Sequence, residues 1–324
     1  MTTRITSELH RETESFVGGL RLALVTPARN EAAFIEGTLK SMVAQCMKPV
    51  RWVIVSDGST DGTDELVMKY VQQRSWIELV RLPERRDRHF AGKVFAFNAG
   101  YERLKEVPYD VIGNVDADIT FDPEHLAFLL RKFTEDPQLG VAGSPFVEGD
   151  LRYDYRFTSL THVSGCCQLF RRECFEEIGG YVPIQIGGID LVAVLTARMK
   201  GWRTRTFPEK VCVHHRKIGT AKQNRLMVAF RGGKGDYRLG MHPLWELSRT
   251  PYQMTKRPYI VAGGLRLAGF TWAMMTRAPK LISVEIVNFR RAEQMSRLRQ
   301  FVGRFFQPSA ERQGGVPTPG TRTL

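Results

Sequence analysis

The sequence has little negative charge in its last third. Residues 216–324 contain 20 lysines and arginines against 5 aspartates and glutamates, whereas residues 1–215 contain 27 against 29. The formal net charge of +13 therefore comes from the C-terminal part, and the first two-thirds is nearly neutral. Such a basic segment indicates a polyanionic neighbour: nucleic acid, an anionic membrane surface or a phosphorylated substrate. A solvated basic face that aids solubility is the alternative.

The sequence also lacks a CxxC pair and an apolar N-terminal run. Its cysteines are odd in number, and two of them are adjacent: Cys46, Cys166, Cys167, Cys174 and Cys212. This pattern argues against a disulfide framework, and the missing CxxC pair removes the usual sign of a zinc site. Reduced thiols in a cytosolic compartment fit best. Glu8, Glu12 and Glu14 interrupt the first 20 residues, so we expect no signal peptide.

Long apolar runs are scarce. Residues 258–276 are largely apolar but contain Arg266, which makes them marginal for a membrane span of about 20 residues. Residues 280–306 have one apolar helical face flanked by arginines, and this pattern fits a helix lying in an anionic interface. A helix packed on the rest of the protein is the alternative. The face comprises Phe289, Ala292, Met295, Leu298, Val302 and Phe305, and the arginines are Arg290, Arg291, Arg297 and Arg304.

The first two-thirds of the chain alternates short apolar runs with stretches of helical periodicity. Strands are expected at 21–26, 51–56, 77–82, 110–115 and 211–215, and helices at 31–46, 64–73, 93–104, 123–135, 171–178 and 189–199. The alternation predicts an α/β domain whose central sheet is mostly parallel and flanked by helices. Ligands bind at the carboxyl ends of the strands in such sheets. The acidic loops after 51–56 and 110–115 should therefore share one edge.

Asp116-Ala-Asp118 directly follows the fourth expected strand. Two carboxylates in this position can converge on one hard cation, and Mg²⁺ completes such a site with phosphates and water. A structural turn is the alternative, but the position within a repeated βα pattern favours the metal. Asp57, in SDGSTDGT, is interpreted as part of a turn before a helix, as an acceptor for a nucleotide base or ribose, or as both.

Five motifs occur together along residues 20–216. They are PARNE (27–31), SDGSTDGT (56–63), AGKVFAFNAG (91–100), DAD (116–118), and the stretch from SGCCQLFRRECFEEIGGY (164–181) to GIDLVAVLTARMKGW (188–202). In order and spacing this set resembles the family-2 glycosyltransferases. The resemblance implies the GT-A fold, a nucleotide-diphosphate sugar donor, Mg²⁺ or Mn²⁺ as cofactor, and inversion at the anomeric carbon.

The resemblance also implies which residues bind the donor. Pro27, Ala28, Asn30 and Glu31 would line the nucleotide pocket, with Glu31 near the ribose. Asp57 would contact the base. These residues are expected to form the nucleotide half of the site.

The same resemblance assigns the chemistry of transfer. Lys93 would approach the nucleotide or diphosphate, Asp116 would contact ribose and metal, and Asp118 would be the principal metal ligand. Asp190 would be the general base that deprotonates the acceptor hydroxyl, with an N-cap of the helix 191–199 as its structural alternative. The residue before it, an acid in the family, is Ile189 here.

His214 and His215 end the last expected strand, beside Arg216 and Lys217. Because imidazole accepts divalent cations readily, we favour His214 as a third metal ligand. A structural role is the alternative. Lys93 and the 214–217 cluster are also candidates to stabilise the diphosphate charge.

Two further motifs give weaker evidence about function. RGGKGDY (231–237) lacks the P-loop spacing, and we interpret it as a basic loop near the diphosphate. The Gln-x-x-Arg-Trp signature of processive synthases is absent, which favours transfer of a single sugar.

The sequence thus predicts an N-terminal extension (1–20), a GT-A catalytic domain (21–216), a basic helical extension (217–306) and a disordered tail (307–324). The predicted activity is metal-dependent, inverting transfer of one sugar to a hydroxyl of a lipid-linked or cell-envelope/exopolysaccharide glycan. The protein should be cytoplasmic and peripheral on the inner face of the membrane, with no nucleic acid partner. The alternatives are a nucleotidyltransferase, a non-catalytic basic protein that binds membrane or nucleic acid, and a catalytically inactive family member.

Overall fold

The computed structural model describes residues 19–84, 90–149, 159–216, 225–255 and 258–306. The chain forms two compact units, residues 1–228 and 229–324, and each is considered by itself. The predicted tail at 307–324, most of the predicted extension at 1–20, and Lys217 lie outside the described residues.

The first unit is built on a seven-stranded sheet with the order β3-β2-β1-β4-β8-β6-β9. Its strands are β1 (Leu22–Ala28), β2 (Arg51–Asp57), β3 (Ile77–Leu82), β4 (Val111–Val115), β6 (Leu139–Gly143), β8 (Cys167–Arg171) and β9 (Arg203–Thr206). The four strands from β3 to β4 are parallel, whereas β8 runs antiparallel to both of its neighbours. The sheet is therefore mixed and mostly parallel, as the sequence predicts.

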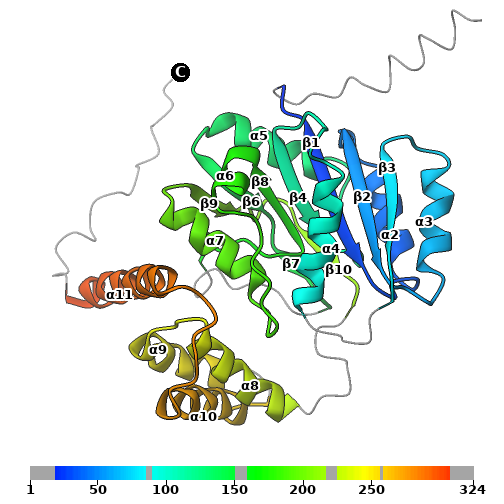
Figure 1. Cartoon of the computed structure of the whole chain (residues 1–324). Helices are drawn as coiled ribbons and strands as arrows, with labels where there is room; N and C mark the ends of the chain where they lie inside the picture. Colours follow the sequence, from blue (N-terminus) through cyan, green and yellow to red (C-terminus); the bar gives the residue numbers. More distant parts are fainter. Residues whose placement is uncertain (1–18, 85–89, 150–158, 217–224, 256–257, 307–324) are drawn as a thin grey trace, which may run out of the picture. The chain divides into compact units, whose positions relative to one another are not determined.

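Helices cover both faces of this sheet (Figure 1). They are α2 (Ile35–Val43), α3 (Thr63–Val71), α4 (Ala91–Glu102), α5 (His125–Glu135), α6 (Arg172–Glu177) and α7 (Ile189–Met199). Leu22 and Leu24 of β1 point into the core shared with α2, α3 and α5. Val25 points the other way, against Gly100 of α4. This alternation along a buried strand is why every residue of β1 except Thr26 is apolar.

A second, three-stranded sheet lies next to the DAD motif. Its order is β5-β10-β7, and its strands are β5 (Ile119–Thr120), β7 (Phe146–Val147) and β10 (Cys212–His214). Thr38 of α2 donates its hydroxyl to the carbonyl oxygens of Ala117 and Ile119, at 2.8 Å each. The segment that carries Asp116 and Asp118 is thus anchored to a buried helix.

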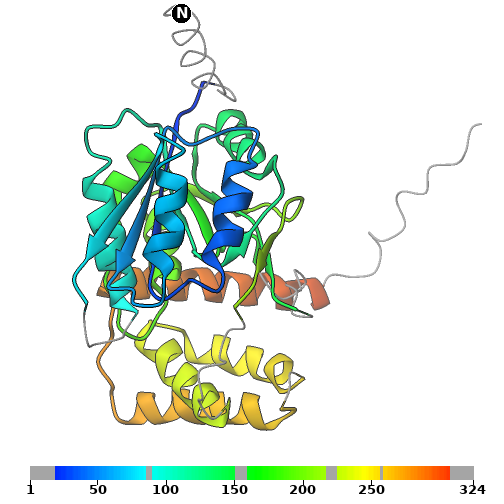
Figure 2. The ribbon, with the colours of Figure 1, turned by 90° about the vertical axis from the view of Figure 1, so that its right-hand side faces the viewer.

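The second unit is helical. Its elements are α8 (Arg225–Arg238, which begins just before the boundary), α9 (Pro243–Met254), α10 (Val261–Met275) and α11 (Val284–Phe306). Helices α8, α9 and α10 group together (Figure 2), and glycines let α8 approach α10. A Cβ at Gly233 would lie 1.8 Å from the Arg266 carbonyl oxygen, and one at Gly269 would lie 2.0 Å from that of Phe230. The RGGKGDY segment is therefore part of a helix with packing glycines, so its interpretation as a loop is wrong.

The described residues contain no helix long and apolar enough to cross a membrane. In α11, Ile286, Val287 and Arg290 are among the buried residues. Arg290 is 6% exposed and donates to the carbonyl oxygen of Leu239 at the end of α8, 2.5 Å away. The expectation that Arg290 flanks an interfacial face is therefore wrong, because a backbone carbonyl of the same unit binds its guanidinium.

Candidate active site

The carboxyl ends of β1, β2 and β4 open into a first cavity. It is lined by Pro27, Ala28, Arg29, Glu31, Asp57, Phe90, Gly92, Lys93, Ala96, Asp116, Ala117, Asp118 and Arg216. Seven of the eight residues that the resemblance assigns to donor binding or to the DAD pair lie here. Asn30 is the exception, and Arg29 and Arg216 are additions. The parallel order β2-β1-β4 brings these distant segments to one edge.

Asn30 has a different task. Its backbone is left-handed, with φ of 55°, and its side-chain oxygen accepts a hydrogen bond from the Thr60 N–H at 2.9 Å. Its own N–H is donated to the Ser59 hydroxyl at 3.1 Å. Asn30 thus ties the loop after β1 to the loop after β2 and does not line the cavity.

The floor of the first cavity concentrates negative charge around one arginine. Arg216 contacts the Glu31 carboxylate and lies 3.3 Å from Asp118. Burial is the main cause that raises the pKa of Glu31 to about 7, and repulsion from Asp118 and Asp116 adds to it. Burial and repulsion from Asp116 likewise raise the pKa of Asp118. The lining of the first cavity holds four carboxylates, Glu31, Asp57, Asp116 and Asp118, against three cations, Arg29, Lys93 and Arg216, and this balance favours a bound cation.

Lys93 forms an ion pair with the first carboxylate of the DAD motif. Its Nζ donates to Asp116 Oδ1 at 2.5 Å. Burial opposes its charge, but attraction to Asp116 and this hydrogen bond outweigh burial and raise the pKa of Lys93. It is therefore a firmly charged ammonium group. Asp57 lies 3.7 Å from the Arg29 guanidinium.

His214 stands between two acids. Its Nε2 lies 3.5 Å from Asp118 Oδ1, and its Nδ1 lies 3.6 Å from Glu148 Oε2. Metal-binding histidines commonly have a carboxylate behind the ring nitrogen that faces away from the ion. His215 instead pairs with the Thr120 hydroxyl at 2.8 Å. Of the two histidines, His214 is the one beside the DAD pair.

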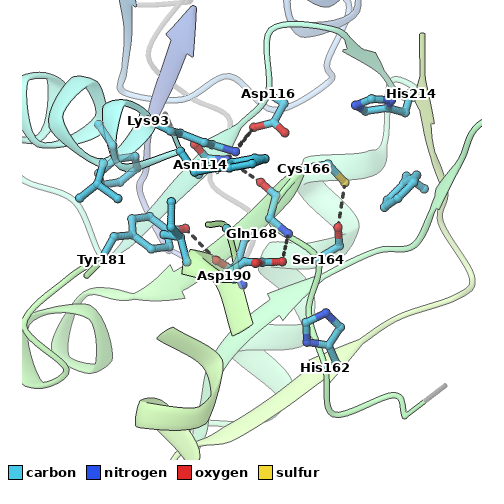
Figure 3. A pocket seen from close by; sticks show the side chains of 18 residues that line it. Lys93, Asn114, Asp116, His162, Ser164, Cys166, Gln168, Tyr181, Asp190 and His214 are labelled. Carbon is cyan, nitrogen blue, oxygen red and sulfur yellow. Dashed lines mark hydrogen bonds and ion pairs between the residues drawn. The ribbon is translucent and has the colours of Figure 1, made fainter. Parts of the chain in front are cut away.

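A second cavity adjoins the first and holds Asp190 (Figure 3). Phe90, Lys93 and Asp116 line both cavities. The second is also lined by Val94, Phe97, Asn114, Phe146, His162, Ser164, Gly165, Cys166, Gln168, Tyr181, Gly187, Gly188, Ile189, Asp190 and His214. The shared wall puts the predicted base on the far side of Asp116 and Lys93 from the first cavity.

Asp190 lies in the first turn of α7, whose N-cap position is Gly188. The alternative that Asp190 itself caps this helix is therefore wrong. Its Oδ2 accepts a hydrogen bond from the Gly165 N–H at 3.2 Å. Ile189, which replaces the family's first acid, is 8% exposed and lines the same cavity. Asp190, the predicted base, thus has an apolar neighbour where the resemblance places a second carboxylate.

His125, Cys167 and Cys212 meet in the buried core, with their ligand-type atoms within 4.8 Å of one another. His125 Nε2 already pairs with the Ser144 hydroxyl at 2.7 Å, and burial lowers the His125 pKa to about 4. Both cysteines belong to the apolar core cluster. We assign this group to core packing, and all five cysteines of the chain are free thiols.

Sequence comparison identifies relatives of the first unit. Residues 23–179 match the family described as Glycosyl transferase family 2. The poly-beta-1,6-N-acetyl-D-glucosamine synthase of Staphylococcus aureus (strain COL) is 26% identical over 203 residues, which are 56% of this chain and 47% of that protein. The Staphylococcus epidermidis synthase of the same name is 28% identical over 170 residues, 46% of this chain and 39% of that protein. The chain spans about half the length of the curated relatives it matches.

Solved structures show the same fold. A mannosyltransferase from Pyrobaculum calidifontis, in complex with GDP-Man and Mn²⁺, aligns with a TM-score of 0.53 at 20% identity, over 87% of this chain and 81% of that one. S. aureus TarS 1–349 in complex with UDP-GlcNAc aligns with a TM-score of 0.50 at 14% identity, over 87% and 81%. The α/β architecture is thus the GT-A fold. Together with the sequence match over residues 23–179, it makes the first unit similar to the glycosyltransferases of family 2.

Proposed function

We propose that this protein is an inverting glycosyltransferase that moves one sugar from a nucleotide-diphosphate donor to an acceptor hydroxyl. The observation that carries this proposal is the wall shared by the two cavities. Asp116 and Lys93 line both of them, so a donor in the first cavity presents its sugar toward Asp190 in the second. Solved structures with this fold bind GDP-Man or UDP-GlcNAc. We therefore propose a nucleotide-sugar of this kind without choosing its base.

In this proposal the first cavity binds the nucleotide. Asp57 accepts a hydrogen bond from the base, Glu31 and Asp116 face the ribose, and Pro27 and Ala28 form an apolar wall. The cations Lys93 and Arg216 stand where the diphosphate carries its charge. Preorganised cations of this kind stabilise charge as it develops on a leaving diphosphate.

The residues present fit a divalent cation. Asp116, Asp118 and His214 offer two carboxylates and an imidazole within one cluster, and the imidazole Nε2 lies 3.5 Å from Asp118 Oδ1. Bound Mg²⁺ or Mn²⁺ would supply further stabilisation of the diphosphate charge. Glu148 would hold the His214 ring from behind.

The transfer step follows from the position of Asp190. Its carboxylate takes the proton of the acceptor hydroxyl, and the hydroxyl oxygen attacks the anomeric carbon from the second cavity. The bond from that carbon to the diphosphate oxygen breaks, and its electron pair leaves with the nucleotide. The Lys93 ammonium group stabilises the negative charge on the leaving diphosphate. Because attack and departure occur on opposite sides, the anomeric configuration inverts.

The test is release of nucleoside diphosphate from UDP-GlcNAc, GDP-Man and a wider donor panel, with and without Mn²⁺. Asp190→Asn should lower turnover by roughly 10²–10⁴-fold, the usual range for a general base, while nucleotide affinity stays within twofold. Asp118→Asn should weaken both Mn²⁺ binding and turnover. Pyrophosphate release would favour a nucleotidyltransferase. Failure of every donor to react or to stabilise the protein would overturn the proposal.

We further propose that residues 217–306 place the catalytic domain on an anionic membrane, where a lipid-linked or cell-envelope glycan is the acceptor. Residues 216–324 carry 20 basic against 5 acidic side chains. Trp272 and Met275, one turn apart on α10, are 56% and 79% exposed, and the cationic Arg277 follows them. Basic side chains near anionic lipid contribute about 1 kcal/mol each.

Co-sedimentation with vesicles tests the membrane proposal. The wild-type chain should pellet with vesicles rich in phosphatidylglycerol and much less with pure phosphatidylcholine. A Trp272→Ser/Met275→Ser double variant should bind several-fold more weakly, since about 25 cal/mol per Å² of apolar contact is lost. Equal partition of wild type and variant would contradict the role of this face.

A further inference from the structure

Two buried amide side chains lie directly opposite each other at the centre of the large sheet. Asn114 on β4 and Gln168 on β8 are register partners, and they are 2% and 0% exposed. A buried amide destabilises the fold unless its polar atoms are hydrogen-bonded. The partners of these two amides therefore indicate why polar residues occupy the sheet here.

Asn114 connects the DAD motif to the loop before β8. Its Nδ2 donates to Asp116 Oδ1 at 3.0 Å and to the Gly165 carbonyl oxygen at 2.6 Å (Figure 3). Both partners are acceptors, so the amide orientation is fixed by its contacts. One side chain thus bonds to a donor-side carboxylate and to the backbone of the second cavity.

Gln168 holds the same loop two residues earlier. Its Nε2 donates to the Val163 carbonyl oxygen at 2.9 Å, and its Oε1 accepts from the Tyr181 hydroxyl at 2.8 Å. The Asp116 N–H adds a bond to the Cys166 carbonyl oxygen at 2.8 Å. Residues 163–166 are therefore fixed to the sheet at three carbonyl groups.

This loop in turn holds the proposed base. The Gly165 N–H donates to Asp190 Oδ2 at 3.2 Å. A Cβ at position 165 would lie 3.0 Å from the Asp190 Cβ, so a larger residue here would require Asp190 or the loop to shift. A continuous path of hydrogen bonds runs from Asp116 through Asn114 and Gly165 to Asp190.

Building on the proposed function, we infer that Asn114 and Gln168 are positioning residues that hold the 163–166 loop, and through it the Asp190 carboxylate, in register with Asp116. Asn114 couples the loop to the donor side, whereas the bonds of Gln168 go to Val163 of the loop and to the Tyr181 hydroxyl. Displacing a reacting group by about 1 Å can cost roughly 10²-fold in rate. Loss of either amide should therefore slow transfer more than it affects folding.

Gln168→Met separates loss of loop positioning from a direct effect on the donor site. It keeps the side-chain volume, and the hydrogen bonds that it removes do not involve Asp116. Gln45→Met is its matched control. Gln45 is also 0% exposed, and its Nε2 donates to the Asp122 carbonyl oxygen at 2.7 Å. Gln45 does not line either cavity. Both variants lose a buried amide, and only one of them loosens the loop.

Three quantities are measured for each protein: kcat and KM for donor turnover with UDP-GlcNAc and GDP-Man, Kd for UDP and GDP with Mn²⁺, and hydrogen exchange of the 163–166 amides. Gln168→Met should lower kcat about tenfold or more, keep the nucleotide Kd within twofold and speed exchange in the loop. Gln45→Met should lose similar thermal stability but keep its kcat. If Gln168→Met does not fold, Gln168→Asn, which keeps an amide one methylene too short for Val163, replaces it.

Equal loss of kcat in Gln168→Met and Gln45→Met would overturn the inference, because the effect would then be one of stability alone. Unchanged exchange at 163–166 in the Gln168 variant would also overturn it. A wild-type protein that releases no nucleoside diphosphate would contradict the proposed function instead. In that case the exchange data still decide whether the amides hold the loop.

Discussion

Replacing Gly165 by alanine should separate catalysis from donor binding. The new Cβ would lie 3.0 Å from the Asp190 Cβ and 3.4 Å from its Cγ. Carbon atoms in contact prefer about 3.5–4.0 Å, so the Asp190 side chain or the loop must move by up to about half an ångström. Because a shift of about 1 Å can cost roughly 10²-fold, we expect kcat to fall about tenfold, which corresponds to about 1.4 kcal/mol of transition-state stabilisation.

The same substitution should leave the nucleotide Kd unchanged, because Gly165 does not line the first cavity. Overpacking should lower the free energy of unfolding by about 1–3 kcal/mol. Steady-state kinetics, nucleotide titration and thermal denaturation measure these three effects.

Gly37→Ala is the matched control for Gly165→Ala. Its Cβ would meet Thr120 at an ordinary 3.4 Å inside helix α2, where alanine should stabilise by about 0.5–1 kcal/mol. This variant should keep wild-type kcat. A Gly165→Ala enzyme with wild-type kcat, or one that loses nucleotide affinity in proportion to kcat, would refute the reasoning.

Three further predictions concern pH, metal and the helical unit. Burial raises the pKa of Glu31 from 4.5 to about 7, so its contribution to stability is full below pH 4.5 and is lost as pH rises through about 7, by up to about 3 kcal/mol. The melting temperature of Glu31→Gln, taken relative to that of the wild type, should therefore be higher at pH 8.5 than at pH 5.5. An equal difference at both pH values would contradict this. His214→Gln should weaken Mn²⁺ binding about tenfold or more, measured by electron paramagnetic resonance of free Mn²⁺, and an unchanged affinity would rule out its role as a ligand. Gly269→Val, whose Cβ meets the Phe230 carbonyl oxygen at 2.0 Å, should lower the melting temperature of the second unit, whereas Gly264→Ala, with open space around its Cβ, should not.

Apolar runs and helical periodicity were enough to predict the first four strands and the six helices of the catalytic half. Of these strands, β1, β2 and β4 lie inside the sheet and are buried on both faces, so most of their residues are apolar, whereas β3 is an edge strand that is only partly buried. The motif DAD marked the edge at which the first cavity forms.

The strands that complete the sheet were missed for physical reasons. In β6 the sequence LGVAG contains two glycines, because a Cβ at Gly140 would lie 2.7 Å from Trp202 and one at Gly143 would lie 2.5 Å from the Cys167 carbonyl oxygen. Glycine-rich segments ordinarily indicate loops. In β8 the buried Gln168 interrupts the apolar run. Its hydrogen bond to the Val163 carbonyl oxygen explains this glutamine, and the sequence does not reveal that contact.

The side chains around the predicted residues were also hard to foresee. Glu148 was not predicted, because it follows β7, a strand of two residues that shows no periodicity, whereas Arg216 lies in the 214–217 cluster that the sequence indicated. Arg290 has the position of an interfacial cation on a helical wheel, but the sequence does not reveal that it reaches the end of α8. Asn30 fitted the family motif, whereas its contacts are with a neighbouring loop.

The antiparallel direction of β8 has a consequence for how such an enzyme can be modified. Because β8 starts at the edge where β1, β2 and β4 end, the segment before it reaches the same edge without another crossover. The residues of the first cavity come almost entirely from positions 27–118, and most of those found only in the second come from 146–190. Under the proposed function, donor and acceptor specificity are thus encoded in consecutive stretches of the sequence. Recombination that exchanges residues 144–190 between relatives should redirect the acceptor while retaining the donor, provided that the incoming loop offers a carbonyl group to Asn114.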